Sequence, residues 1–276
     1  MSGVSQLTAI KRAIKSNDVD VVHRLLAGDP DLVIARDQGW TPLQDAAFRA
    51  RTQILRVMLA EGSGITPVDI AHALHHAVQL PRLDPEVVEA LLGTGHVSEP
   101  FVALYRGDLA ELERSLRAAP SLIHAKDAEG YPLLLRAAEN AQEEVVRLLL
   151  AHGADVEGRG PYETSPLSSC ACNQVDRRKR SKTLRLLLES GANVNGRTRH
   201  GRTALFSAAT AGWGPEDSVK VLLEHGADPN IRNDHGRTVL EEVLLHPSTR
   251  SRRVATLLCK GGAEGSGDTE LARASR

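Results

Sequence analysis

The sequence contains few aromatic residues and few cysteines, and both shortages exclude certain kinds of protein. Aromatic side chains make up 3% of the 276 residues, so a core must be built from Leu, Val, Ile and Ala, which suits thin layers of closely packed helices. The three cysteines, Cys170, Cys172 and Cys259, are too few for a disulfide framework and favour a reducing, cytoplasmic setting. No apolar run reaches the length of about 18 residues that marks a membrane span, and none marks a signal peptide.

The usual enzyme and nucleotide-binding motifs are also absent. The chain has no G-x-S-x-G, no Walker glycine loop, no H-E-x-x-H and no G-x-G-x-x-G. Its composition, 41% hydrophobic and 25% charged residues with a net charge of -1, is typical of a soluble folded protein and indicates no particular partner. The charge is unevenly distributed, because residues 1–158 carry 15 basic and 22 acidic residues whereas 159–276 carry 19 and 13.

What the chain does have is an internal repeat. The stretch SGANVNGRTRHGRTALFSAA at 190–209 returns as HGADPNIRNDHGRTVLEEV at 225–243, displaced by 35 residues. Apolar triplets ending at 150, 188 and 223 are each followed by Gly-Ala, and Leu257-Leu258 with Gly262-Ala263 is a fourth instance. Glycine fits there because the residue that follows a helix often has a left-handed backbone conformation. The repetition predicts stacked structural units.

Helix starts recur in step with these glycines. Thr41-Pro42 and Thr66-Pro67 each offer a threonine cap and a proline at the first helical position, with Gln44 and Asp69 placed to complete the cap. Caps follow at Ser165, Thr203 and Thr238. Between cap and glycine each unit holds two short helices with one apolar face, and neither helix could bury that face alone.

These units resemble ankyrin repeats. The resemblance depends on D-x-x-G-x-T-P-L-x-x-A-A followed by V-x-x-L-L-x-x-G-A-D/N-x-N, best matched at 127–155, 198–230 and 233–263. It implies an all-α solenoid of stacked helix-turn-helix repeats with short β-hairpin fingers. We expect one array over 1–264 and a flexible tail over 265–276, and we number its repeats 1–8, near 6–36, 37–65, 66–97, 98–127, 128–158, 159–196, 197–231 and 232–264. Repeats 1, 3 and 4 are degenerate.

Two features depart from the family pattern. The family places a histidine after T-P-L that links neighbouring repeats, but the residues here are Gln44, Asp69, Leu135, Ser168, Phe206 and Glu241. Leu135 and Phe206 can only pack, so we expect weaker coupling between repeats than in an idealised array.

The second departure is a set of long helix–helix turns at 173–182, 211–217 and 246–253. We expect these turns to lie side by side as a basic edge, formed by Arg177, Arg178, Lys179, Arg180, Lys182, Arg250, Arg252 and Arg253 together with Trp213. This edge is either simply solvated or contacts an acidic protein or nucleic acid. Nucleic acid is the less favoured partner, because stacking on bases needs more aromatics than Trp213 alone.

The resemblance also implies a binding surface, the concave groove formed by the fingers and the first helices. Matching position to position, it comprises Gln38, Trp40, Glu129, Tyr131, Tyr162, Arg199, His200, Arg202, His235 and Arg237 on the fingers, and Asp45, Arg136, Ser169, Ser207 and Glu242 on the helices. Aromatic residues among arginines are typical of interface hot spots. The favoured hypothesis is therefore a monomeric, non-enzymatic adaptor that binds another protein, with no cofactor and no membrane contact.

An alternative function would use the irregular repeats 3 and 4. Asp69, His72 and His76 are spaced i, i+3 and i+7, on one face of a predicted helix. A carboxylate and two imidazoles are metal ligands, but the sequence nominates no further ligand from another helix. The alternative hypothesis is an enzyme, or a binder of a small molecule or metal, at this place.

Overall fold

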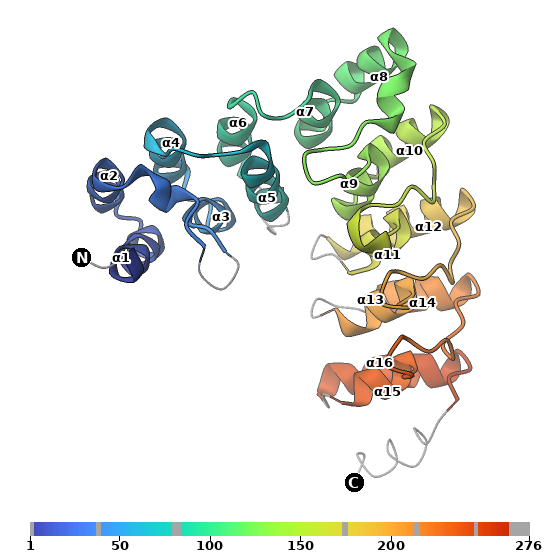
Figure 1. The fold of residues 1–276 in the computed structure, drawn as a ribbon. Coiled ribbons are helices and arrows are strands. Elements are labelled where there is room, and N and C mark those ends of the chain that lie inside the picture. Colours follow the sequence, from blue (N-terminus) through green and yellow to red (C-terminus); the bar gives the residue numbers. More distant parts are fainter. Residues whose placement is uncertain are drawn as a thin grey trace. The chain divides into compact units, whose positions relative to one another are not determined.

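The computed structural model describes residues 3–36, 40–78, 84–172, 176–211, 216–245 and 248–264, and these contain 16 α-helices (Figure 1). The predicted all-α repeat fold is confirmed. The chain divides into two compact units, Met1–Asp108 with Asp127–Glu129, and Leu109–Lys126 with Gly130–Arg276. The helices of each unit pack in two layers. None of the described helices is long and apolar enough to cross a bilayer.

In the first unit one layer consists of first helices and the other of second helices. The first layer contains α1 (Gly3–Ser16), α3 (Pro42–Phe48) and α5 (Pro67–Val78), and the second contains α2 (Val19–Gly28), α4 (Thr52–Glu61) and α6 (Pro85–Leu92). A 3-10 turn, η1 (Pro30–Val33), follows α2, and α7 (Glu99–Arg106) packs on α6. The core between the layers is aliphatic, as the scarcity of aromatics predicts.

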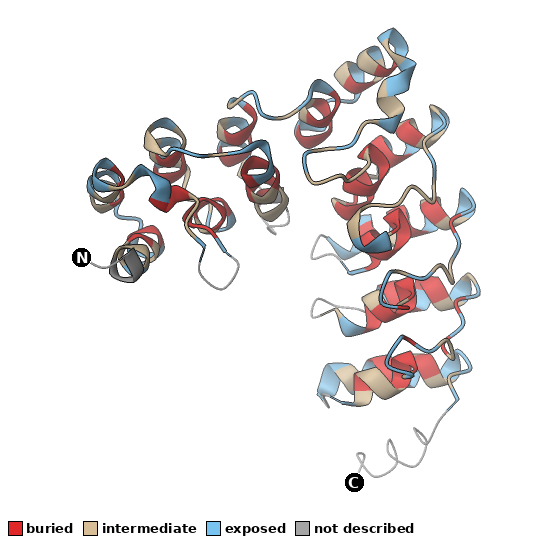
Figure 2. Ribbon diagram, viewed as in Figure 1, coloured by how far each residue is buried: buried red, intermediate tan, exposed pale blue. Residues whose placement is uncertain are grey.

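The second unit repeats the arrangement more regularly. Its first helices are α9 (Leu133–Glu139), α11 (Pro166–Cys172), α13 (Ala204–Thr210) and α15 (Val239–Leu244), and its second helices are α8 (Leu109–Ala118), α10 (Glu143–Ala151), α12 (Arg177–Glu189), α14 (Glu216–Glu224) and α16 (Thr249–Lys260). Two 3-10 turns, η2 (Pro120–His124) and η3 (Pro161–Glu163), complete it. Each helix packs on its counterpart in the next repeat, and buried residues line the facing sides of the helices (Figure 2).

Helix ends follow the predicted caps closely. Thr41 with Gln44 and Thr238 with Glu241 form complete capping boxes, and the Asp69 carboxylate accepts a hydrogen bond from the Thr66 backbone N–H. Thr203 differs, because its side chain forms no cap hydrogen bond at the start of α13. At the opposite ends, the predicted glycines 153, 191, 226 and 262 have φ between +82° and +93°. Their left-handed backbone is the reason glycine recurs there.

The predicted β-hairpin fingers are tight turns rather than strands in the described residues. Thr198 N–H donates to the Arg202 carbonyl at 2.9 Å, and Asn233 N–H donates to the Arg237 carbonyl at 2.9 Å. Such short segments leave room for too few backbone pairs to extend a ladder. Neighbouring turns are linked instead, because Arg199 N–H donates to the Tyr162 carbonyl at 3.1 Å and Asp234 N–H to the His200 carbonyl at 3.3 Å.

Asparagines at the end of two repeats form hydrogen bonds to the next repeat. Asn230 Oδ1 accepts from the Glu264 N–H at 2.7 Å, and its Nδ2 donates to the Gly262 carbonyl at 3.0 Å. Asn195 makes the same two bonds to Asp228 and Gly226, one repeat earlier. Each asparagine ends the G-A-D/N-x-N motif, so the motif itself couples the repeats.

We expect Asn230→Ala to lower the free energy of unfolding of the second unit by about 1–2 kcal/mol, because it removes two hydrogen bonds between repeats. Urea unfolding followed by circular dichroism would measure this. The matched control is Asn193→Ala, since among the described residues the Asn193 side chain bonds only the nearby Asn195 N–H, at 3.0 Å. Equal losses in the two variants would contradict a coupling role for Asn230.

Candidate functional site

In the structure, each of the three proposed metal ligands contacts a different partner. The Asp69 carboxylate caps α5 through Thr66, His72 Nε2 lies 2.8 Å from Glu129 Oε1, and the His76 ring stacks on Trp40 with centroids 4.2 Å apart. Within the described ranges, no group of three or more His, Cys, Asp or Glu side chains is arranged to hold a metal ion. The described geometry gives no support to a metal site at Asp69, His72 and His76, because spacing on one helix face did not account for the partners that each side chain finds.

The predicted basic edge lies on helices rather than in loops. Asp176 caps α12, so Arg177, Arg178 and Lys179 are exposed in its first turn, and the backbone N–H groups of Lys179 and Arg178 hold the pKa of Asp176 below its usual value. Ser248 likewise caps α16, which carries the exposed Arg250, Arg252 and Arg253. Between these helices packs α14, whose first turn is acidic with Glu216 and Asp217. The edge therefore alternates in charge, which disfavours a continuous row of contacts to the phosphates of a nucleic acid.

Two members of that edge need further comment. Lys182 is exposed and pairs with Glu143 at 3.7 Å, but Arg180 is only 1% exposed, so its assignment to a solvated edge is wrong. Burial lowers the pKa of the Arg180 guanidinium. The helical period would have revealed this, because Arg180 lies three, four and seven residues before the buried Thr183, Leu184 and Leu187. The predicted Trp213 lies outside the described residues.

Two predicted groove residues are also buried. Arg136 is 1% exposed, its Nη1 lies 2.9 Å from Glu139 Oε2, and its guanidinium carbon lies 4.0 Å from the ring centroid of Tyr131. Ser169 is 6% exposed. Neither side chain is available to a partner. Every residue of the seven-residue helix α9 is buried, so an outward position in the family pattern is here an inward one.

Other predicted residues form an exposed row in the second unit. We call finger face the turns before α9, α11, α13 and α15 together with the exposed sides of α13 and α15. On it Tyr162 is 64% exposed, and Arg199, His200 and His235 are also exposed. None of these four side chains forms a hydrogen bond or ion pair with another described residue. The backbone bonds between turns hold them in sequence along the repeats.

Tyr162 has an unusual backbone. It and Glu163 have φ of +62° and +57°, in the left-handed region. For residues other than glycine this conformation costs about 1–2 kcal/mol each, and such strain concentrates at functional sites. The surrounding hydrogen bonds, from Gly160 N–H to the Thr164 carbonyl and from Arg199 N–H to the Tyr162 carbonyl, keep the turn in this form. A strained turn therefore presents a mostly exposed tyrosine.

In the first unit, the predicted Trp40 belongs to an aromatic cluster. Its ring meets Phe48 edge to face with centroids 5.4 Å apart and stacks on His76, and Trp40 and Phe48 are 37% and 39% exposed. The predicted Asp45 is paired with Arg49 at 2.8 Å, while Glu129 contacts His72. Phe48 was not predicted, although an aromatic residue so close to Trp40 is a signal in a chain with few aromatics. Gln38 lies outside the described residues.

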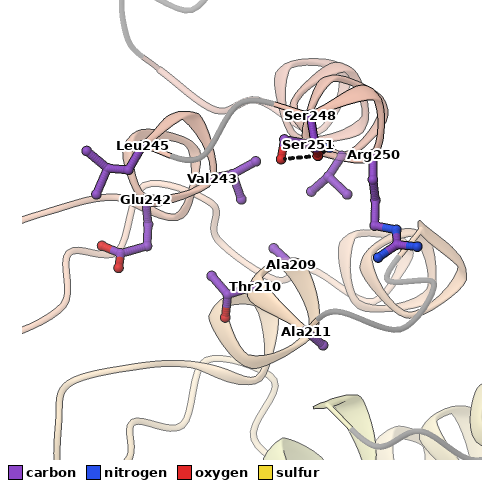
Figure 3. A pocket seen from close by; sticks show the side chains of 10 residues that line it. Ala209, Thr210, Ala211, Glu242, Val243, Leu245, Ser248, Arg250 and Ser251 are labelled. Atoms are coloured by element: carbon purple, nitrogen blue, oxygen red, sulfur yellow. Dashed lines mark hydrogen bonds between the residues drawn. The ribbon is translucent and has the colours of Figure 1, made fainter.

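A hollow that the sequence did not predict lies between the last two repeats (Figure 3). Its volume is about 600 Å³, and it is formed by the end of α13, by α15 and by the start of α16. Apolar side chains from these helices lie beside hydroxyl groups and two charged residues: Ala209, Thr210, Ala211, Glu242, Val243, Leu245, Ser248, Arg250, Ser251 and Val254. Leu245 is 50% exposed, so the hollow offers apolar surface to solvent.

The side chains of the three cysteines offer little chemistry. Cys170 is fully buried as a small core residue, and burial raises the pKa of its thiol well above the usual value. Cys259 is half-buried, and Cys172 is the exposed one. An unreactive thiol in the core does not form a nucleophilic site.

Comparison with known proteins agrees with the repeat architecture. The family model described as ankyrin repeats matches in three copies, over residues 74–198 and 177–233, which together span more than half of the chain. No curated protein matches the sequence. The helix pairs α1–α2 and α3–α4 lie before the matched region.

Proposed function

Since the chain belongs to the ankyrin-repeat family, whose repeats generally bind other proteins, we propose that it is a non-enzymatic adaptor that binds a protein through the finger face of repeats 5–8. The observation that carries the proposal is the exposed row of Tyr162, Arg199, His200 and His235 on turns fastened to one another. A tyrosine and an arginine at such positions are the residue types that contribute most to protein interfaces.

The surface is preorganised for a macromolecular partner. The finger turns are joined by backbone hydrogen bonds, so binding does not have to order them, and this lowers the entropic cost of association. Protein is the better-supported class of partner because the exposed row alternates aromatic, cationic and imidazole groups, whereas the basic edge on α12 and α16 is interrupted by the acidic start of α14. The aromatic cluster at Trp40 would be a second, separate contact in the first unit.

Substitutions at Tyr162 separate binding from folding. We expect Tyr162→Ala and Tyr162→Gly to lose partner binding alike, by roughly ten- to a hundredfold for a hot-spot tyrosine. Their stabilities should differ, because glycine relieves the left-handed strain and should make the second variant more stable than the first by about 1 kcal/mol. Binding would be measured by titration with the captured partner and stability by urea unfolding. Retention of binding in both variants would contradict the proposal.

The partner itself can be captured with a photo-crosslinking amino acid at position 162, introduced in the native cell. The matched control places the same group at Lys220, which is exposed on the second helix α14. We expect a protein crosslinked from position 162 and absent from position 220. Equal crosslinking from both positions would place the contact elsewhere.

A further inference from the structure

Repeats 5, 7 and 8 carry comparable pairs of side chains at the start of the first helix. The pair joins the residue just before the helix N-cap to the residue five positions later. In repeat 8 these are Arg237 and Glu242, whose Nε and Oε2 lie 2.8 Å apart. In repeat 5 they are Tyr131 and Arg136, in contact at 4.0 Å through a cation–π interaction. In both repeats, the second residue of the pair is the interaction partner of the first residue.

Repeat 7 breaks this pattern. Arg202 occupies the position that corresponds to Arg237, but the residue five positions later is Ser207, which has no charge. The Arg202 guanidinium donates through Nη2 to Thr210 Oγ1 at 2.6 Å and forms no ion pair with a carboxylate in the described part of the chain. Both Arg202 and Ser207 are partly exposed. A cation thus lies on the finger face without its counter-ion, beside a residue small enough to leave room for one.

The surroundings of Arg202 also indicate what accompanies that counter-ion. Thr210, which receives the Arg202 hydrogen bond, lines the hollow between α13, α15 and α16 (Figure 3). Apolar side chains, including Val243, Leu245 and Val254, line the same hollow. Nearby Arg199, on the same turn as Arg202, adds a second exposed cation whose side chain has no partner among the described residues. An anionic group over Ser207 would therefore lie close to a hollow whose lining is apolar in part, beside the hydroxyl groups and the charged Glu242 and Arg250.

We propose that Arg202 binds a side-chain carboxylate of a partner protein over Ser207, and that an adjacent apolar side chain of the same partner segment enters the hollow. This rests on the proposed function and specifies its partner as an acidic segment with an apolar anchor. Glutamate at 242 shows the geometry, because it holds Arg237 as the partner's carboxylate would hold Arg202. A charge-assisted hydrogen bond of this kind is among the stronger polar contacts available at a protein surface.

The test uses random peptides displayed on phage, selected against the full chain and then measured singly as labelled synthetic peptides. We expect the selected peptides to share an Asp or Glu next to a large apolar residue. Ser207→Glu should then weaken the binding of these peptides by roughly ten- to a hundredfold, because the new carboxylate, from the same chain, would pair with Arg202 in place of the peptide's carboxylate. Ser207→Gln has the same size without the charge and should change binding by less than about threefold. Circular dichroism would verify that both variants are folded.

The outcomes separate this inference from the proposed function. Peptides that lack acidic residues and bind Ser207→Glu as well as the original chain would overturn the inference and leave the finger face as a protein-binding surface. If no peptide is selected, the inference and the proposed function are both overturned. A separate arm of the test uses labelled single- and double-stranded oligonucleotides. If these bind in place of peptides, and their binding depends on Arg202, the Arg202 guanidinium binds nucleic acid and the inference is overturned.

Discussion

Glu139→Ala is expected to lower the free energy of unfolding of the second unit by about 3–5 kcal/mol. Arg136 and Glu139 are buried and their side chains meet at 2.9 Å on α9. Removing the carboxylate leaves a guanidinium in a place where water cannot replace its partner, and the cation–π contact with Tyr131 compensates only in part. Chemical unfolding followed by circular dichroism would measure the loss, and hydrogen exchange would show whether the amides of α9 and α11 open first.

A double variant distinguishes the loss of the buried ion pair from a simple loss of packing. When Arg136→Met is added to Glu139→Ala, no buried charge remains, so the double variant should be more stable than Glu139→Ala alone. If instead the two losses add, the ion pair contributes nothing specific and the destabilisation of Glu139→Ala comes from the missing side-chain volume. Either residue is a poor choice for testing partner binding, because both act inside the fold.

Phe206→Ala is expected to cost about 3–5 kcal/mol, because it removes a large side chain that is only 1% exposed. Phe206 occupies the position where the family carries its linking histidine, and α13 packs against both α11 and α15. The cavity would open between three repeats, so unfolding should spread along the array. Urea unfolding would show the loss as a lower transition midpoint.

The control for Phe206 keeps an apolar side chain at the position. Phe206→Leu should cost about 1–2 kcal/mol, since leucine fills much of the same space. A loss for Phe206→Ala no larger than that for Phe206→Leu would mean that the neighbouring helices collapse into the cavity, and that packing at this position does not couple the repeats.

Features that depend on near neighbours in the chain were predictable. The capping boxes of Thr41 and Thr238 involve residues three positions apart, and the glycines after the second helices need only their own left-handed φ. The burial of Leu135 and Phe206 also followed from the repeat, because side chains without polar groups have no other place in a stack of thin layers. These signals were sufficient for the all-α repeat fold.

Features that depend on neighbouring repeats were not predictable in the same way. Arg136 was assigned to the groove from its position in the repeat, and Arg180 to the basic edge from its place in a long turn, yet both are 1% exposed. A short helix such as α9 turns all of its residues inward when helices and turns cover it on several sides. The basic edge failed as a continuous surface because α14 brings its acidic first turn between α12 and α16.

By itself, the sequence determined the repeated helix pairs and where most of them begin and end, because caps and left-handed glycines act over a few residues. Tertiary structure alone decided which arginines face solvent, that Arg237 pairs with Glu242 while Arg202 contacts Thr210 and no carboxylate of the described residues, and that a hollow opens between the last repeats. The physical reason is that burial depends on side chains from adjacent repeats, about 35 residues away in the chain, and that even a pair within one repeat forms only where the folded turn and helix bring its two side chains together.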